Sequence, residues 1–126
     1  MKNIKATLRV RTWFETEKGV LFGIGRVLLL KKVSELGSLN KAAKELGMSY
    51  RAAWGKIKAT EEKLGCKLLN NSQGAKGFRL TDIGENLLES FDRFQEEVEQ
   101  FAMKKAKDAF PWKVQNFQAS NEPPEE

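Results

Sequence analysis

Apolar residues recur at helical spacing between Ile24 and Leu36, in the stretch IGRVLLLKKVSEL. They stand at positions 27, 28, 30, 33 and 36, which gathers them on one side of a helix with about 3.6 residues per turn. Gly37 follows at once and suits the left-handed conformation in which many helices end. The pattern therefore predicts an amphipathic helix over residues 24–36.

Two further helices follow across connections of only two or three residues. Ser38 precedes the helical pattern of residues 39–46, and Ser49 precedes the pattern of residues 50–64. A serine at this position caps a helix by accepting a hydrogen bond from its first turn, and a glycine follows each segment. The adjacent alanines of the first of these helices are small enough for a close crossing. The arrangement predicts a helix-turn-helix.

The later helix of this pair has two different faces. Ala53, Ile57, Thr60 and Leu64 fall at i, i+4, i+7 and i+11, which marks the side toward the core. No carboxylate occurs between residues 46 and 60, although a solvated helix face normally carries both signs of charge. The opposite side presents Arg51, Ala52, Gly55, Lys56 and Ala59. Small and basic residues on an exposed face favour close approach to the major groove of DNA.

Short hairpins flank the helices. The N-terminal stretch IKATLRVRTWFETEKGVLFG alternates apolar and polar residues around a turn at TEKG, which predicts a strand, a turn and a shorter strand. The stretch CKLLNNSQGAKGFRLT places two short strands around the polar, basic loop NNSQGAKG. A hairpin directly after a helix-turn-helix is a wing.

Thr81 and Asp82 cap a long final helix. Apolar residues at steps of 4, 3, 4 and 3 form a coiled-coil seam along it, namely Leu87, Phe91, Phe94, Val98 and Phe101. Such a seam packs either on the first helix of its own chain or on a second copy. We expect a homodimer, because a helix that projects past a small body usually needs a partner. We expect one domain over residues 1–108 and a flexible polar tail over residues 109–126.

The composition argues against an enzyme. The chain of 126 residues has no histidine and only Cys66 as cysteine, which leaves no convincing metal site or pair of nucleophile and base. We therefore expect neither a metal nor a cofactor. A lone cysteine, the absence of a signal sequence and the absence of a long apolar run predict a cytoplasmic protein without membrane contact.

Charge is divided unevenly along the chain. The net charge is +5, but residues 1–81 carry 17 Lys or Arg against 6 Asp or Glu, while residues 82–126 carry 5 against 11. A basic body with an acidic end is common in nucleic-acid-binding proteins. Arg51 is the best candidate to recognise guanine through two hydrogen bonds. Lys41, Lys56 and Lys58 are expected to contact phosphate. For Trp54, at the border of the two helix faces, a core role is favoured and a DNA contact stays open.

The run SELGSLNKAAKELGMSYRAAWGKIKATEEKLG, followed by the wing and LTDIGENLL, resembles the amino-terminal winged-helix domain of the ModE family of molybdate-responsive transcription regulators. A weaker similarity to LysR-type regulators lies in AAKELGMSYRAAWGKIKATEEKLG. The ModE resemblance implies a winged-helix fold, homodimerisation and operator binding. It implies DNA contacts at Ser49, Tyr50, Arg51, Ala52, Lys56 and residues 71–79. Family members continue into molybdate-binding domains, for which this sequence has no residues, so we expect no direct molybdate binding by this polypeptide.

Together these patterns predict a mainly α fold with small β elements, a winged helix-turn-helix with an N-terminal hairpin and a long C-terminal dimerisation helix. The expected function is a homodimeric, sequence-specific DNA-binding transcription regulator. A protein-interaction adaptor and a small oxyanion-binding protein remain as alternatives. The predicted DNA-contact set comprises Ser38, Asn40, Lys41, Ser49, Tyr50, Arg51, Ala52, Gly55, Lys56, Lys58, Asn71, Ser72, Gln73, Lys76 and Arg79.

Overall fold

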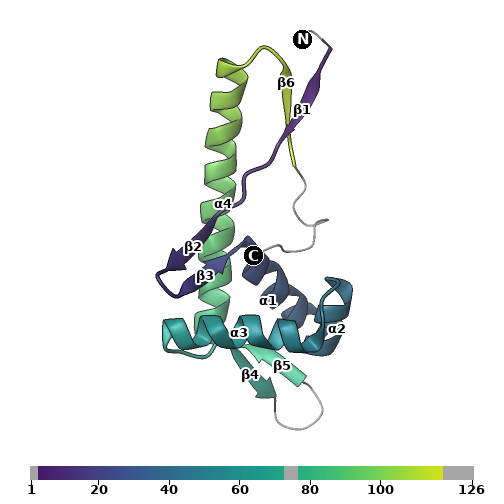
Figure 1. The fold of residues 1–126 in the computed structure, drawn as a ribbon, viewed down its shortest axis with the longest axis vertical. Coiled ribbons are helices and arrows are strands. Elements are labelled where there is room, and N and C mark those ends of the chain that lie inside the picture. Colours follow the sequence, from purple (N-terminus) through teal and green to yellow (C-terminus); the bar gives the residue numbers. More distant parts are fainter. Residues whose placement is uncertain (1–2, 73–76, 118–126) are drawn as a thin grey trace.

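A computed structural model describes residues 3–72 and 77–117, with the side chains of residues 71 and 72 left aside. The chain begins with the strands β1 (Lys5–Leu8), β2 (Trp13–Thr16) and β3 (Gly19–Gly23). β2 and β3 pair antiparallel, and Gly19 takes a φ of 118° where the chain turns between them. The predicted N-terminal hairpin is confirmed. Its first strand is shorter than the alternating pattern suggested, because β1 leaves the hairpin and pairs elsewhere (Figure 1).

Three helices follow and form the body of the molecule (Figure 1). They are α1 (Ile24–Leu36), α2 (Leu39–Glu45) and α3 (Tyr50–Leu64). The hydroxyls of Ser38 and Ser49 cap α2 and α3 by accepting hydrogen bonds from the N–H groups of Lys41 and Ala52, at 3.1 and 3.0 Å. Left-handed glycines with φ between 67° and 75° follow the three helices. Sequence-local signals therefore determine where these helices begin and end.

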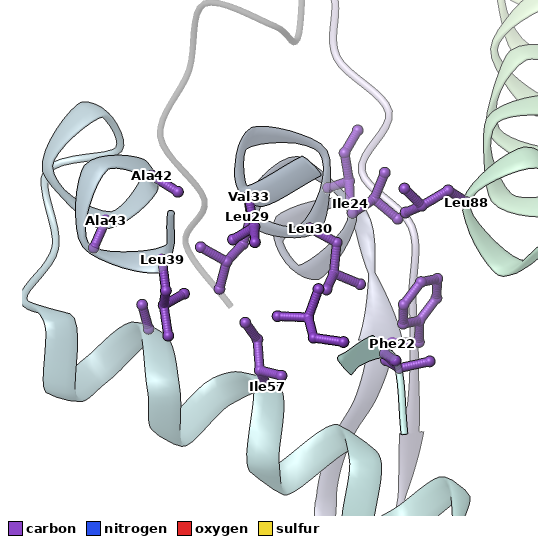
Figure 2. Packing of buried hydrophobic residues seen from close by; sticks show 14 of the residues in the cluster. Phe22, Ile24, Leu29, Leu30, Val33, Leu39, Ala42, Ala43, Ile57 and Leu88 are labelled. Atoms are coloured by element: carbon purple, nitrogen blue, oxygen red, sulfur yellow. The ribbon is translucent and has the colours of Figure 1, made fainter. Parts of the chain in front are cut away.

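The core lies where α1 crosses α2 and α3. Leu29, Leu30 and Val33 of α1 are at most 1% exposed. Ile57 of α3 points toward these residues, and Leu88 approaches them from the final helix (Figure 2). The helices are therefore held in place by one shared apolar cluster, which fixes the orientation of α3.

The wing consists of β4 (Leu69–Ser72) and β5 (Gly77–Leu80), which pair antiparallel. Its base is fastened by Glu61 of α3, whose carboxylate accepts hydrogen bonds from the N–H groups of Leu68 and Leu69 at 2.7 and 3.1 Å. Glu61 is only 7% exposed, and a buried carboxylate needs such donors. The end of α3 and the start of the wing are thus joined by a charged hydrogen-bond acceptor.

The final helix, α4 (Asp82–Ala109), has 28 residues and extends well past the three-helix body (Figure 1). Its buried face consists of Gly84, Leu88, Phe91 and Gln95. Phe91 is 4% exposed, and its ring meets that of Phe22 edge to face at 5.8 Å. Phe91 therefore belongs to the core of its own chain, which corrects its assignment to a dimer seam.

The other predicted seam residues lie on a neighbouring face of α4. Phe94 and Phe101 are 43% and 63% exposed, and Val98 between them is half-buried. Leu87 is half-buried and packs against the core. An apolar strip of Phe94, Val98 and Phe101 remains, which begins beside Phe14 of β2 and continues into the second half of the helix.

After α4 the chain turns back and forms β6 (Lys113–Asn116), which pairs in parallel with β1. Ala6 lies opposite Val114 in this pair, and both are half-buried. The flexible tail predicted from residue 109 therefore does not begin there. The segment after α4 contacts α4 and pairs with β1, in a contact between distant segments that local patterns do not reveal (Figure 1).

The segment between β1 and β2 is tied to α4 by Gln95. The side-chain amide of Gln95 donates to the carbonyl oxygen of Val10 at 2.6 Å, and its oxygen accepts a hydrogen bond from the Thr12 hydroxyl. The Thr12 carbonyl in turn accepts from the N–H of Ile24 at 3.2 Å, at the start of α1. These bonds explain why residues 9–12 leave strand geometry.

Candidate nucleic-acid interface

The turn between α2 and α3 fixes how α3 is presented. Ala42 and Ala43 are 0% and 1% exposed, so small side chains fill the crossing of the two helices. Gly47 has a φ of 73°, and the N–H of Met48 donates to the Ala43 carbonyl at 2.9 Å. The predicted helix-turn-helix geometry is present.

α3 buries the face that its sequence predicted. Ala53, Ile57 and Thr60 are at most 2% exposed. The Thr60 hydroxyl donates to the Leu21 carbonyl at 2.9 Å and accepts from Nε of Arg26 at 3.1 Å. Because this polar residue is bonded on both sides, it adds to the packing of α3 on the body without an unpaired hydroxyl.

The opposite face of α3 carries the small and basic residues of the predicted DNA-contact set. Arg51, Ala52 and Gly55 are exposed, and Lys56 is half-buried. A β-carbon built at Gly55 would meet nothing within 4 Å, so this face is free of overlying protein. A double-stranded nucleic acid can therefore lie close to the helix backbone here.

A depression of about 420 Å³ continues this face toward the wing. It brings together the first turn of α2, the first residue of α3 and the start of β5. Its lining includes Ser38, Asn40, Lys41, Tyr50, Gly77 and Phe78. No carboxylate occurs among the described residues that line it. The structure thus gathers four members of the predicted set on one surface of suitable charge.

The serine residues of the set have a second task. Ser38 and Ser49 each accept a backbone hydrogen bond as helix caps. A hydroxyl that accepts one bond can still donate its own proton. Each serine can therefore cap its helix and donate to a phosphate or a base at the same time.

Lys58 is placed differently from the other basic residues of α3. Its ammonium lies 3.5 Å from the Glu61 carboxylate and 4.6 Å from the centre of the Trp54 ring. The Glu61 carboxylate favours the charged form of Lys58 and helps to raise its pKa, while repulsion by the Lys58 ammonium lowers the pKa of Lys67. A phosphate would compete with these neighbours for Lys58.

Trp54 is 37% exposed and so lies outside the buried core. Its ring centre is 6.2 Å from that of Phe78 in β5. The interpretation of Trp54 as a core anchor therefore needs revision. The residue stands between α3 and the wing.

The predicted wing residues are divided by the structure. Asn71 and Ser72 belong to β4, while Gln73 and Lys76 lie outside the described residues. Arg79 in β5 is exposed, and it lines a separate polar cavity of about 510 Å³ together with residues of α1 and the first turn of α4. The described structure does not bring Arg79 onto the α3 face.

Sequence reasoning missed the residues that seat the wing. Gly77 has a φ of 76°, and a β-carbon there would overlap the carbonyl oxygen of Gly37. The next N–H, that of Phe78, donates to the same oxygen at 3.2 Å. A glycine just before an alternating strand is a signal for such a close approach, but the sequence does not reveal which segment it approaches.

Among residues 3–72 and 77–117, none of the helices combines the length and the apolar character that a membrane span requires. Within the same residues, no three Cys, Asp or Glu side chains converge as metal ligands would.

Residues 24–85 match the family model described as bacterial regulatory helix-turn-helix protein, lysR family. Over 76 residues the chain is 36% identical to the molybdenum-pterin-binding protein MopB of Rhodobacter capsulatus, covering 58% of this chain and 28% of MopB. Over 95 residues it is 33% identical to the transcriptional regulator ModE of Haemophilus influenzae, covering 73% of this chain and 36% of ModE. The chain therefore spans only about a third of the length of these relatives.

Solved structures agree with the sequence relatives. The CbnR_DBD–DNA complex superimposes with a TM-score of 0.56 and 28% identity, covering 68% of this chain and 95% of that one. Full-length CbnR, a LysR family transcriptional regulator, superimposes with a TM-score of 0.53 and the same identity, covering 67% of this chain and 28% of that one. These comparisons confirm the winged-helix fold class and the resemblance to ModE and LysR-type regulators.

Proposed function

We propose that the chain, whose residues 24–85 match the model of the lysR-family helix-turn-helix, is a cytoplasmic, homodimeric transcription regulator rather than an enzyme. In this proposal α3 enters the major groove of an operator and the wing contacts the DNA backbone or the minor groove. The relatives that carry the name ModE are transcriptional regulators. The CbnR domain that superimposes on this chain forms a complex with DNA.

One observation carries the proposal: from Tyr50 to Thr60 the exposed face of α3 is open, small and free of carboxylates. Arg51 and Gly55 stand on this face, and the first turn of α2 and the base of the wing continue it through one depression. Acidic side chains would repel phosphate, and bulky ones would hold the helix away from the base edges. The surface is therefore suited to contact with double-stranded DNA.

The homodimer is proposed from α4. The apolar strip of Phe94, Val98 and Phe101 begins beside Phe14 of β2, whose ring centre is 5.9 Å from that of Phe94, and continues into the second half of α4. Charge along α4 is separated, since acidic residues dominate from Asp82 to Glu99 while the last turns carry three lysines, Lys104, Lys105 and Lys107. An antiparallel pair of α4 helices covers both strips and brings the basic end of each helix to the acidic part of the other. A parallel pair would place like charges side by side.

The experiment is site selection from random duplex DNA with the purified protein, followed by affinity measurements from 50 to 200 mM salt, a range over which about six phosphate contacts change affinity roughly a thousandfold. Arg51→Ala should relax the preference at one base position, at a cost of about 1–3 kcal/mol for the preferred base. Lys76→Ala should weaken all sequences alike. Enrichment of no sequence, or an affinity that does not respond to salt, would contradict the proposal. Loss of folding in Arg51→Ala would show that the face assigned to DNA is needed for the core.

A further inference from the structure

Phe78, the second residue of β5, contacts two separate parts of the body. Its backbone N–H donates to the Gly37 carbonyl at 3.2 Å, in the turn between α1 and α2. Its ring lies 6.2 Å from that of Trp54 at an interplanar angle of 50°. Phe78 is half-buried and packs against the core cluster. The wing is therefore attached through a backbone bond on one element and a side-chain contact on another.

Trp54 reaches the wing from the flank of α3. The ammonium of Lys58, one turn further along the helix, lies 4.6 Å from the centre of the Trp54 ring. The same ammonium is 3.5 Å from the Glu61 carboxylate. Glu61 in turn accepts the two backbone bonds from the base of β4. Contacts from α3 thus hold the wing on both of its strands, through Glu61 at β4 and through Trp54 at β5.

The wing is also held by the Phe78–Gly37 bond and by the buried side chain of Leu69, which is 6% exposed, but its own sheet is small. β4 and β5 form a sheet of two four-residue strands, and a two-stranded hairpin is at best marginally stable alone. The exposure of Trp54, at 37%, is high for a residue that serves only the core. The position of its ring is explained by contact with the wing.

We propose that Trp54 and Phe78 are positioning residues that fix the wing relative to α3, so that the two elements engage DNA as one rigid unit. This inference rests on the proposed function. A wing that is already fixed relative to α3 can contact phosphate without a further loss of conformational entropy when α3 binds DNA. The aromatic pair acts on DNA affinity through the wing and not through a contact of its own.

The test is a double-mutant cycle on DNA binding. Wild type, Trp54→Ala, Phe78→Ala and the double variant are compared for affinity to the selected operator and for the salt dependence of that affinity, with folding checked by thermal unfolding. Each single variant should lose about tenfold in affinity and show a smaller salt slope, because wing contacts to phosphate are lost. The double variant should lose no more than either single one. Base preference should stay unchanged, and Trp54→Phe should restore most of the affinity.

Two controls separate positioning from other effects. Trp13→Ala removes an equally large and exposed side chain in β2 and should leave the salt slope unchanged. If the losses of the two single variants add in full, each residue acts on DNA or on the fold by itself and the inference is wrong. It is equally wrong if the variants lower only the melting temperature and bind DNA normally when folded. Failure of the wild type to bind DNA would instead contradict the proposed function.

Discussion

The carbonyl oxygen of Gly37 accepts a hydrogen bond from the backbone N–H of Phe78 at 3.2 Å. This bond joins the turn after α1 to the first residues of β5. Gly77, the residue before Phe78, approaches the same oxygen so closely that a β-carbon at position 77 would overlap it. Two glycines thus meet where the wing leaves the body.

Gly77→Ala should therefore destabilise the fold. The alanine would hold a φ near 76° at a cost of about 1–2 kcal/mol, and the overlap with Gly37 adds to it. Gly65→Ala is the matched control, since Gly65 has a φ of 75° but open space around a β-carbon. Urea denaturation should show a larger loss at Gly77 than at Gly65. Equal losses would mean that the contact with Gly37 is without consequence.

Gly55 is expected to separate stability from DNA binding. It stands inside α3 with open space around a β-carbon, so Gly55→Ala should raise the free energy of unfolding by about 0.5–1 kcal/mol. Gly55→Leu should remain folded but bind DNA more weakly, because the larger side chain holds α3 away from the groove. Filter binding and thermal unfolding measure the two effects. Wild-type affinity in Gly55→Leu would remove this face from the DNA contact.

Phe101→Glu should yield monomers that remain folded. The ring is 63% exposed in a single chain, so little packing is lost within the chain, while two carboxylates would be forced into a dimer seam. Sedimentation velocity measures the change, and Gln100→Glu on the same helix should leave the dimer intact. Phe91→Ala should instead lower the free energy of unfolding by about 3–5 kcal/mol, because the Phe91 ring is part of the core. A dimeric Phe101→Glu protein would exclude this strip as the interface.

Glu61→Ala should be costly although it removes a buried charge. The substitution leaves the N–H groups of Leu68 and Leu69 without their acceptor, and each unpaired buried donor costs about 1–3 kcal/mol. The exposed neighbour Glu62 is the control, and its replacement by alanine should change stability by less than about 0.5 kcal/mol. Chemical denaturation compares the two. Similar values would show that water replaces the carboxylate at the base of the wing.

The helices were predictable because their signals are local. Ser38 and Ser49 cap the helices that their positions predicted, and the glycines that follow the helices are left-handed. The buried face of α3, with Ala53 and Ile57, follows directly from the helical repeat. A cap or a repeat needs only a few neighbouring residues, so these predictions required no knowledge of the rest of the chain.

Contacts between distant segments were not predictable in the same way. Phe91 and Phe94 both fit a 4, 3 spacing, yet Phe91 lies against Phe22 while Phe94 is 43% exposed. Helical spacing identifies apolar strips but does not say which strip meets the chain's own core. The same limit applies to the strand at residues 113–116, whose partner lies at the other end of the sequence. For the candidate site, the α3 face was predicted from its composition, but the seating of the wing on Gly37 was not.

The pairing of β1 with β6 has a consequence for biosynthesis. Lys5 lies opposite Lys113, so the first strand has no partner until residues 113–116 have left the ribosome. The helix-turn-helix and wing can fold earlier, because the core cluster that holds them lies within residues 21–91. During that interval β1 presents an unpaired strand edge, which is the kind of surface that associates wrongly with other chains. The charged residues Lys5 and Arg9 in and beside this strand oppose such association until β6 arrives.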